Sequence, residues 1–131
     1  MSAIVNTFNL QLINLATVLS KRFESDNDLK LAVTGIQTLK KANSNKNIEM
    51  FTMYVYKYRE KIMDKNEDLL LDTDFISENN QSDSDNSAFD IMSKLKDKWK
   101  TLESDEKDNI WKYLQVLIKL TDKHIQTLGI Q

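Results

Sequence analysis

Apolar side chains recur at steps of three and four over the first 23 residues, the spacing of one face of an α-helix. The stripe consists of Val5, Phe8, Leu12, Leu15, Leu19 and Phe23. The first twenty residues carry no charged side chain, as in a signal or membrane-spanning segment. Polar residues such as Asn6, Asn9 and Asn14 nevertheless interrupt every apolar run, which neither kind of segment tolerates. We therefore expect an amphipathic core helix over residues 3–23, with interfacial membrane binding as the alternative.

Two further stripes predict two further helices. The first follows "ESDND", where Ser25 or Asp26 can cap a helix start, and it continues to about residue 42. Its members are Leu29, Ala32, Val33, Ile36 and Leu39. Gly35 lies inside this helix and favours a close helix–helix crossing there. The second stripe predicts one continuous helix from about residue 46 to 64, and it consists of Ile48, Phe51, Val55, Tyr58 and Ile62.

The chain between residues 65 and 87 is expected to be irregular. A short element at "NEDLLLDTDFI" places Leu69 to Leu71 and Phe75 under the bundle. The next stretch, "SENNQSDSDNS" at residues 77–87, contains three acids, no base and no apolar side chain. This composition predicts a flexible acidic loop, because the segment has nothing to bury.

Two helices are predicted after this loop. The stripe of the fourth consists of Phe89, Met92, Leu95, Trp99 and Leu102. The fifth opens at "ESDEKD", with Ser104 or Asp105 as cap, and its row consists of Ile110, Leu114, Leu117, Thr121, Ile125 and Leu128. Trp111 lies beside this row, so we expect it to anchor the last helix in the core; a partner groove built from the same aromatics is the alternative.

Composition supports an all-α fold. The 131 residues include no proline and two glycines, the two residue types that folds rich in tight turns use most. We predict a single domain over residues 1–131, a bundle of about five helices with the acidic loop between the third and fourth. The absence of cysteine excludes disulfides, thiol catalysis and zinc–thiolate sites.

No motif for catalysis or metal binding is recognisable. His124 is the single histidine, and no glycine-rich turn could expose a nucleophile or hold a phosphate. The stretch "DSDNSAFDIMSK" begins like a calcium loop, but Ala88 stands where the loop needs glycine and Lys94 where it needs an acid. We therefore expect neither an enzyme nor a bound cofactor or metal ion.

Lysines gather in two places, although the formal net charge is −2. The first group forms two short rows on the fourth helix, Lys94/Lys98 and Lys96/Lys100, and the second lies between two helices, at Lys40, Lys41 and Lys46. Solvated basic faces are common on helices, so nucleic-acid contact through these lysines is the second reading.

The order of "NEDLLLDTDF", Trp99 and "IWKYLQ" at residues 110–115 resembles small uncharacterised helical proteins of nucleocytoplasmic large DNA viruses. In those proteins an acidic-apolar block precedes a lone tryptophan and a closing Ile-Trp-Lys-Tyr-Leu-Gln helix. The resemblance covers roughly residues 50–120. This chain departs from it by lacking a proline–glycine turn after the leucines and by carrying the acidic insert. The resemblance implies a viral protein of the host cytoplasm or the virion, and it implies no activity or catalytic residue.

Together these features predict a non-catalytic viral factor with a protein-interaction or structural role. A protein partner, which could be a second copy of the chain, is expected first, nucleic acid second, and a membrane is not expected. Trp99, Trp111 and Tyr113 are the candidate interaction residues, because aromatic side chains contribute strongly to interfaces when they are exposed. The alternative is a nucleic-acid-associated factor in viral replication or transcription that uses the two lysine groups.

Overall fold

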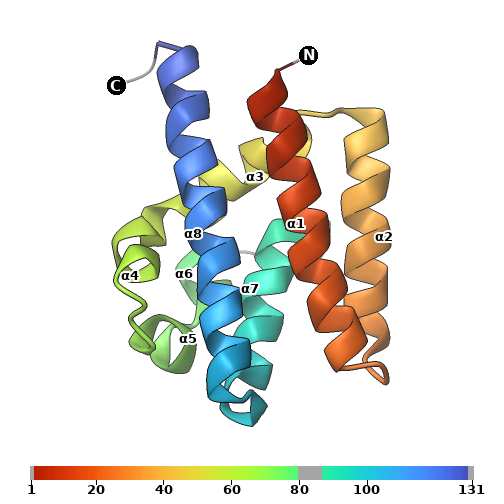
Figure 1. Cartoon of the computed structure of the whole chain (residues 1–131), viewed down its shortest axis with the longest axis vertical. Helices are drawn as coiled ribbons and strands as arrows, with labels where there is room; N and C mark the ends of the chain where they lie inside the picture. Colours follow the sequence, from red (N-terminus) through yellow and green to blue (C-terminus); the bar gives the residue numbers. More distant parts are fainter. Residues whose placement is uncertain (1, 80–86, 130–131) are drawn as a thin grey trace.

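The computed structural model describes residues 2–79 and 87–129, and within these ranges it contains helices and no strand. The predicted all-α class is therefore confirmed. The two longest helices, α1 (Ala3–Arg22) and α8 (Ser104–Thr127), lie side by side and antiparallel. As Figure 1 shows, the beginning of α1 and the end of α8 consequently lie at the same end of the molecule.

The helix α2 (Asn27–Ala42) follows α1 after a tight turn and runs back along it. Each of these two helices is capped by the residue before it. The Ser2 hydroxyl accepts from the backbone N–H groups of Ile4 and Val5, and the Asp26 carboxylate accepts from those of Asp28 and Leu29. Because such caps are local, these helices begin close to the predicted positions.

The predicted continuous helix over residues 46–64 is wrong. The helix α3 (Lys46–Tyr54) ends at Val55, a single 3₁₀ turn η1 (Tyr56–Tyr58) follows, and α4 (Arg59–Met63) resumes the helical path. The Tyr56 hydroxyl donates to the Asp122 carboxylate on α8. This bond attaches the interrupted part of the chain to α8, a helix that is far away in the sequence.

The predicted loop over residues 77–87 is also wrong at both edges. The short helix α5 (Asp68–Asp72) precedes it, and a second short helix, α6 (Phe75–Asn79), extends into it, so residues 77–79 are helical. The next helix, α7 (Ser87–Lys98), already includes residue 87 and continues into the 3₁₀ turn η2 (Trp99–Thr101). The rest of the predicted loop, residues 80–86, lies outside the described residues.

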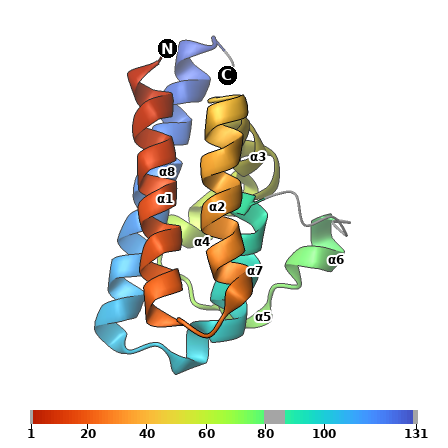
Figure 2. The same ribbon diagram turned by 90° about the vertical axis from the view of Figure 1, so that its right-hand side faces the viewer.

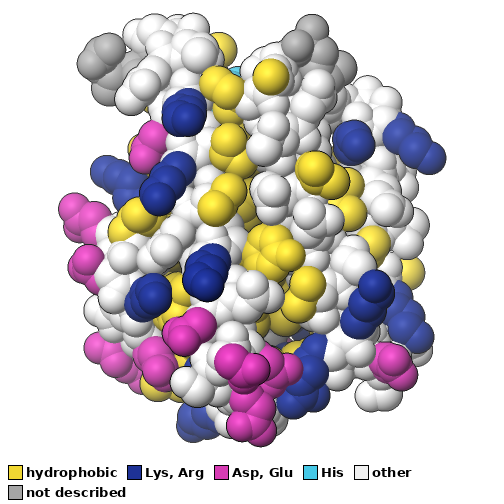
Figure 3. Space-filling view, viewed as in Figure 1, with side chains coloured by type: hydrophobic (Ala, Val, Ile, Leu, Met, Phe, Trp, Pro, Cys, Tyr) yellow, Lys and Arg dark blue, Asp and Glu magenta, His cyan; other side chains and the backbone are white. Residues whose placement is uncertain are grey.

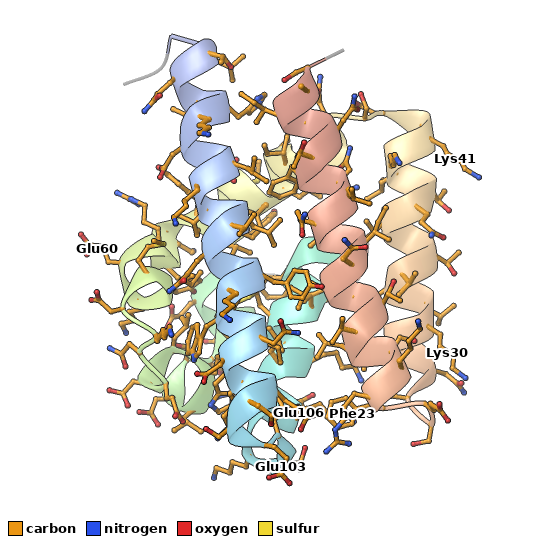
Figure 4. All side chains as sticks on the ribbon, in the orientation of Figure 1. Phe23, Lys30, Lys41, Glu60, Glu103 and Glu106 are labelled. Atoms are coloured by element: carbon orange, nitrogen blue, oxygen red, sulfur yellow. The ribbon has the colours of Figure 1, made fainter. Side chains whose placement is uncertain are left out.

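The start of α8 carries a capping box. The Glu103 side chain accepts from the backbone of Glu106, and the Glu106 carboxylate accepts from the Glu103 N–H at 2.8 Å. Arg22, in the last turn of α1, donates to the same Glu106 carboxylate at 2.6 Å. Figure 4 shows Glu106 and Phe23 together at the lower end of the molecule, where α1 ends and α8 begins.

The stripes predicted from the sequence form most of the core. Phe8 of α1 meets Phe51 of α3 edge to face, with ring centroids 5.2 Å apart, and both side chains are buried. Four polar residues are buried in the described part of the chain, Asn9, Asn47, Thr73 and Thr121, and the two asparagines bond to each other. The Asn47 amide donates to the Asn9 side chain at 3.3 Å and to the Ile36 carbonyl at 3.1 Å, and the Asn9 amide donates to the Ser44 carbonyl at 2.9 Å. These bonds satisfy the buried amides and fix α1, α2 and α3 against one another.

Candidate functional site

The two tryptophans proposed as interaction residues lie in the core. Trp99 is completely buried and Trp111 is 3% exposed, and their rings meet edge to face with centroids 5.3 Å apart. The Trp99 indole N–H donates to the Glu67 carboxylate at 3.1 Å, which satisfies its one polar atom. They are therefore not surface anchors, and the expectation that Trp111 anchors the last helix is confirmed.

Tyr113, the third candidate, is half-buried on α8 and packs against the core. Its ring thus offers only part of its surface to a partner. The face that α1 and α8 form mixes lysines, acids and apolar side chains, as Figure 3 shows, and the acids gather towards its lower end.

The predicted basic row Lys94/Lys98 is not a free surface. The Lys94 ammonium lies 2.9 Å from the Asp26 carboxylate and 3.2 Å from that of Asp28, while Lys98 lies 3.1 Å from Asp26. The hydrogen bond from Lys94, assisted by Lys98, lowers the pKa of Asp26 to about 2. Burial alone would lower the pKa of Lys94, but its bonds to Asp26 and Asp28 outweigh burial and raise it. These lysines join the α1–α2 turn to α7.

The other predicted lysines do not form one basic surface with Lys94 and Lys98, because they are spread over α2, α3, α7 and η2. Lys96 donates to the Leu71 carbonyl at 3.2 Å, and Lys100 is exposed in η2. Lys40 and Lys41 are exposed in the last turn of α2, where the negative end of the helix dipole stabilises their positive charges. Figure 4 shows Lys41 pointing away from the molecule. The fifth, Lys46, is half-buried and faces a groove instead.

This groove, which sequence reasoning missed, lies between α2, α3 and α7. It has a volume of about 730 Å³ and an apolar lining of Leu31, Ala32, Leu39 and Met50 around Gly35. Figure 2 shows α2 in front, with α3 behind its upper half and α7 behind its lower half. Gly35, where a close helix crossing was expected, lies in the wall of this groove. We call this feature the α2–α3–α7 groove.

Leu31 is the most exposed large apolar side chain among the described residues, at 68%. It lies off the apolar stripe of α2, and this position is the signal that the sequence offered. A leucine on the solvated face of a helix is common by itself. Only the fold shows that Leu31 stands at the edge of an apolar groove.

Charged and polar groups are distributed unevenly along the groove. Asp28 and Lys94 line the part towards the start of α2, where the Lys94 ammonium lies 3.2 Å from the Asp28 carboxylate. Lys46 lines the part towards the end of α2, and Asp90 lines the α7 wall. Ser93 also lines the groove, but its hydroxyl oxygen is enclosed by its neighbours and has no hydrogen-bond partner within the described part of the chain. The groove therefore offers an apolar floor between the exposed Asp28 carboxylate at one end and Lys46 at the other.

The remaining candidate chemistry of the described residues is limited to metal binding, His124 and the apolar helix α1. Within residues 2–79 and 87–129 no group of three or more His, Cys, Asp or Glu side chains could hold a metal ion. His124 is half-buried on α8, with its Nδ1 atom enclosed and without a partner in the same ranges. The helix α1 is long and apolar enough to cross a membrane, but its apolar stripe is buried inside the bundle.

No family model, curated protein or solved structure matches the chain.

Proposed function

We propose that the chain is a non-catalytic viral protein-interaction or structural factor that binds a protein partner in the α2–α3–α7 groove. One observation supports this proposal above the others. The groove exposes Leu31 beside an apolar lining, whereas the tryptophans are buried in the core. Covering a leucine side chain fully contributes about 1.5–3 kcal/mol, enough for an interface to depend on it.

The proposal includes the architecture in which the groove lies. The longer helices α1, α2, α3, α7 and α8 form one single-domain bundle of about five helices, in which α4, α5 and α6 are short connecting elements. The acidic loop predicted from the sequence leads into α7, and α7 forms one wall of the groove. Limited proteolysis tests the single-domain architecture. A single domain should be cleaved first within the acidic loop, and the rest of the chain should resist as one core.

The groove is tested by two matched leucine substitutions. Leu31→Asp places a charge at the edge of the groove, and Leu10→Asp places one on α1, where Leu10 is 52% exposed. Both variants are expected to fold, because both side chains are largely in solvent. In nuclease-treated extracts of infected host cells, Leu31→Asp should lose the co-purifying proteins and Leu10→Asp should retain them. Retention of the same set by both variants would exclude the groove.

A nucleic-acid-associated role in viral replication or transcription is the second candidate. It is supported by Lys40 and Lys41, whose side chains are exposed at one end of α2. Binding through these lysines should weaken steeply as salt concentration rises. In a plot of the logarithm of the binding constant against the logarithm of salt concentration, the double variant Lys40→Gln, Lys41→Gln should reduce the slope by about 2. Binding of labelled single- and double-stranded DNA and RNA at several salt concentrations measures this effect.

The viral origin is part of the same proposal and depends on "IWKYLQ" and the acidic-apolar block before it. We propose the host cytoplasm or the virion as the location. Mass spectrometry of purified virions and of fractionated infected cells tests both locations. Detection only in other compartments would contradict them.

A further inference from the structure

We propose that the occupant of the α2–α3–α7 groove is an amphipathic helix of about three turns that lies antiparallel to α2. Its first turn carries acidic side chains beside Lys46, and its last turn carries basic side chains beside Asp28. This inference rests on the proposed function and specifies the partner's chemistry and direction.

The length of the occupant follows from the groove. Along α2 the lining extends from Asp28 to Leu39, which corresponds to roughly 16 Å of helix at about 1.5 Å per residue. A second helix covering this length needs about 11 residues. So short a helix is marginal alone in water, so we expect it to be ordered by binding.

A helix suits the groove better than an extended peptide. An extended peptide leaves its backbone N–H and C=O groups unpaired unless a strand edge receives them, and the described residues contain no strand. A helix satisfies these groups internally and needs mainly an apolar surface. Ala32 and Gly35 are small, so they leave room for the partner's larger side chains between Leu31 and Met50.

The charges of the groove set the direction. Asp28 lies in the first turn of α2 and its side chain is 73% exposed, so it can meet a partner cation while contacting Lys94. Lys46 opens α3, beyond the far end of α2. An isolated helix prefers acids in its first turn and bases in its last, because its dipole is positive at the start. A partner helix with this ordinary pattern matches both ends of the groove only when it runs from Lys46 towards Asp28.

The experiment uses a display library of helical peptides of about 14 residues. All members carry leucine or alanine at the spacing of one helix face, and lysine and glutamate are randomised at both ends. Selection on the full chain, with counter-selection on Leu31→Asp, should enrich glutamate in the first turn and lysine in the last. A synthetic peptide of this pattern and its charge-reversed counterpart are then measured by fluorescence anisotropy.

The expected preference is about tenfold for the acid-first peptide, with binding lost in Leu31→Asp. Lys46→Glu should reverse much of this preference, and this reversal excludes a mere difference in the helicity of the two peptides. If both peptides bind equally and Leu31→Asp abolishes both, the inferred direction is overturned and the groove remains an interaction surface. If no peptide is enriched, or if sedimentation shows a wild-type dimer that Leu31→Asp disrupts, the helical partner itself is overturned.

Discussion

The helix pair α1–α8 and the segment from Lys46 to Met63 have equally clear apolar stripes, but only the pair consists of unbroken helices. In the pair, the ends are set locally, by the Ser2 cap and by the capping box of Glu103 and Glu106. In the segment, the chain breaks at Val55, and side chains of α8 hold the parts in place through Asp122 and Gln115. Periodicity therefore reports which face is buried, but it does not report where a helix is interrupted, and distant polar contacts accompany the interruption.

The largest expected effect comes from Phe8→Asp, which attacks the pair at its buried face. The side chain is completely buried against Phe51, and a carboxylate there would have no partner. The lost packing alone costs about 3–5 kcal/mol, so we expect no cooperative thermal unfolding by circular dichroism.

The matched control is Leu10→Asp, two residues away on the exposed side of α1, which should change stability by no more than about 0.5 kcal/mol. Liposome flotation tests the alternative, in which the same stripe binds a membrane surface. A Phe8→Asp protein that stays folded but no longer floats would show that the stripe faces lipid.

The second effect concerns Asp26, which joins the end of α1 and the start of α2 to Lys94 and Lys98 on α7. Its pKa is about 2 in the folded chain against an ordinary 3.8, so folding favours the ionised form. This contribution is complete above about pH 4 and disappears as the pH falls towards 2.

Asp26→Asn keeps a capping oxygen but loses the charge, so it should lower the free energy of unfolding near pH 6 by about 1–2 kcal/mol. The wild type and the variant should converge near pH 2 in urea unfolding experiments. A constant difference from pH 6 to pH 2 would contradict the ion-pair explanation. Asp28→Asn, at a side chain that is 73% exposed, provides the control.

The same difference between local and distant causes explains what the sequence predicted. The starts of α1 and α2 were predictable because Ser2 and Asp26 lie next to the turns that they cap. The break at Val55 was not, because Val55 and Ile62 are buried on both sides of it and the stripe continues through it. The contact that accompanies the break joins Tyr56 to a residue 66 positions away.

The candidate site was less predictable than the fold for a related reason. Exposed and paired lysines have the same spacing, and the partner of Lys94 is 68 positions away at Asp26. Trp99 gave no sign of whether its indole N–H would find Glu67 in the core or a partner outside. The α2–α3–α7 groove is formed by three helices, so the position of Leu31 at its edge could not be predicted before those helices were placed.

The third effect tests the bond at the break. The hydrogen bond to Asp122 raises the pKa of Tyr56 above its ordinary 10.0, with burial contributing in the same direction. The stabilisation is therefore fully present below about pH 10 and is lost as the pH rises further. Tyr56→Phe should lower stability by about 1 kcal/mol at neutral pH and remove this part of the alkaline loss. Tyr54→Phe, with the same chemical change just before the break, is the control, and an equal effect from it would contradict this role of Tyr56.

The smallest effect is the one that separates the two regions most directly. Gln115 lies on α8, but its amide donates to the carbonyls of Met63 at 3.1 Å and Ile62 at 3.4 Å, at the end of α4. Gln115→Ala removes these bonds from α4 while giving α8 a residue of higher helix propensity. We expect a loss of about 0.5 kcal/mol, because water can replace a partly exposed donor. Native-state hydrogen exchange should then show faster exchange at Asp64, whose N–H bonds to Glu60, and unchanged exchange in the middle of α8. Equal acceleration at Asp64 and in the middle of α8 would mean that the segment and the pair unfold together. The local stability of the two regions would then not differ.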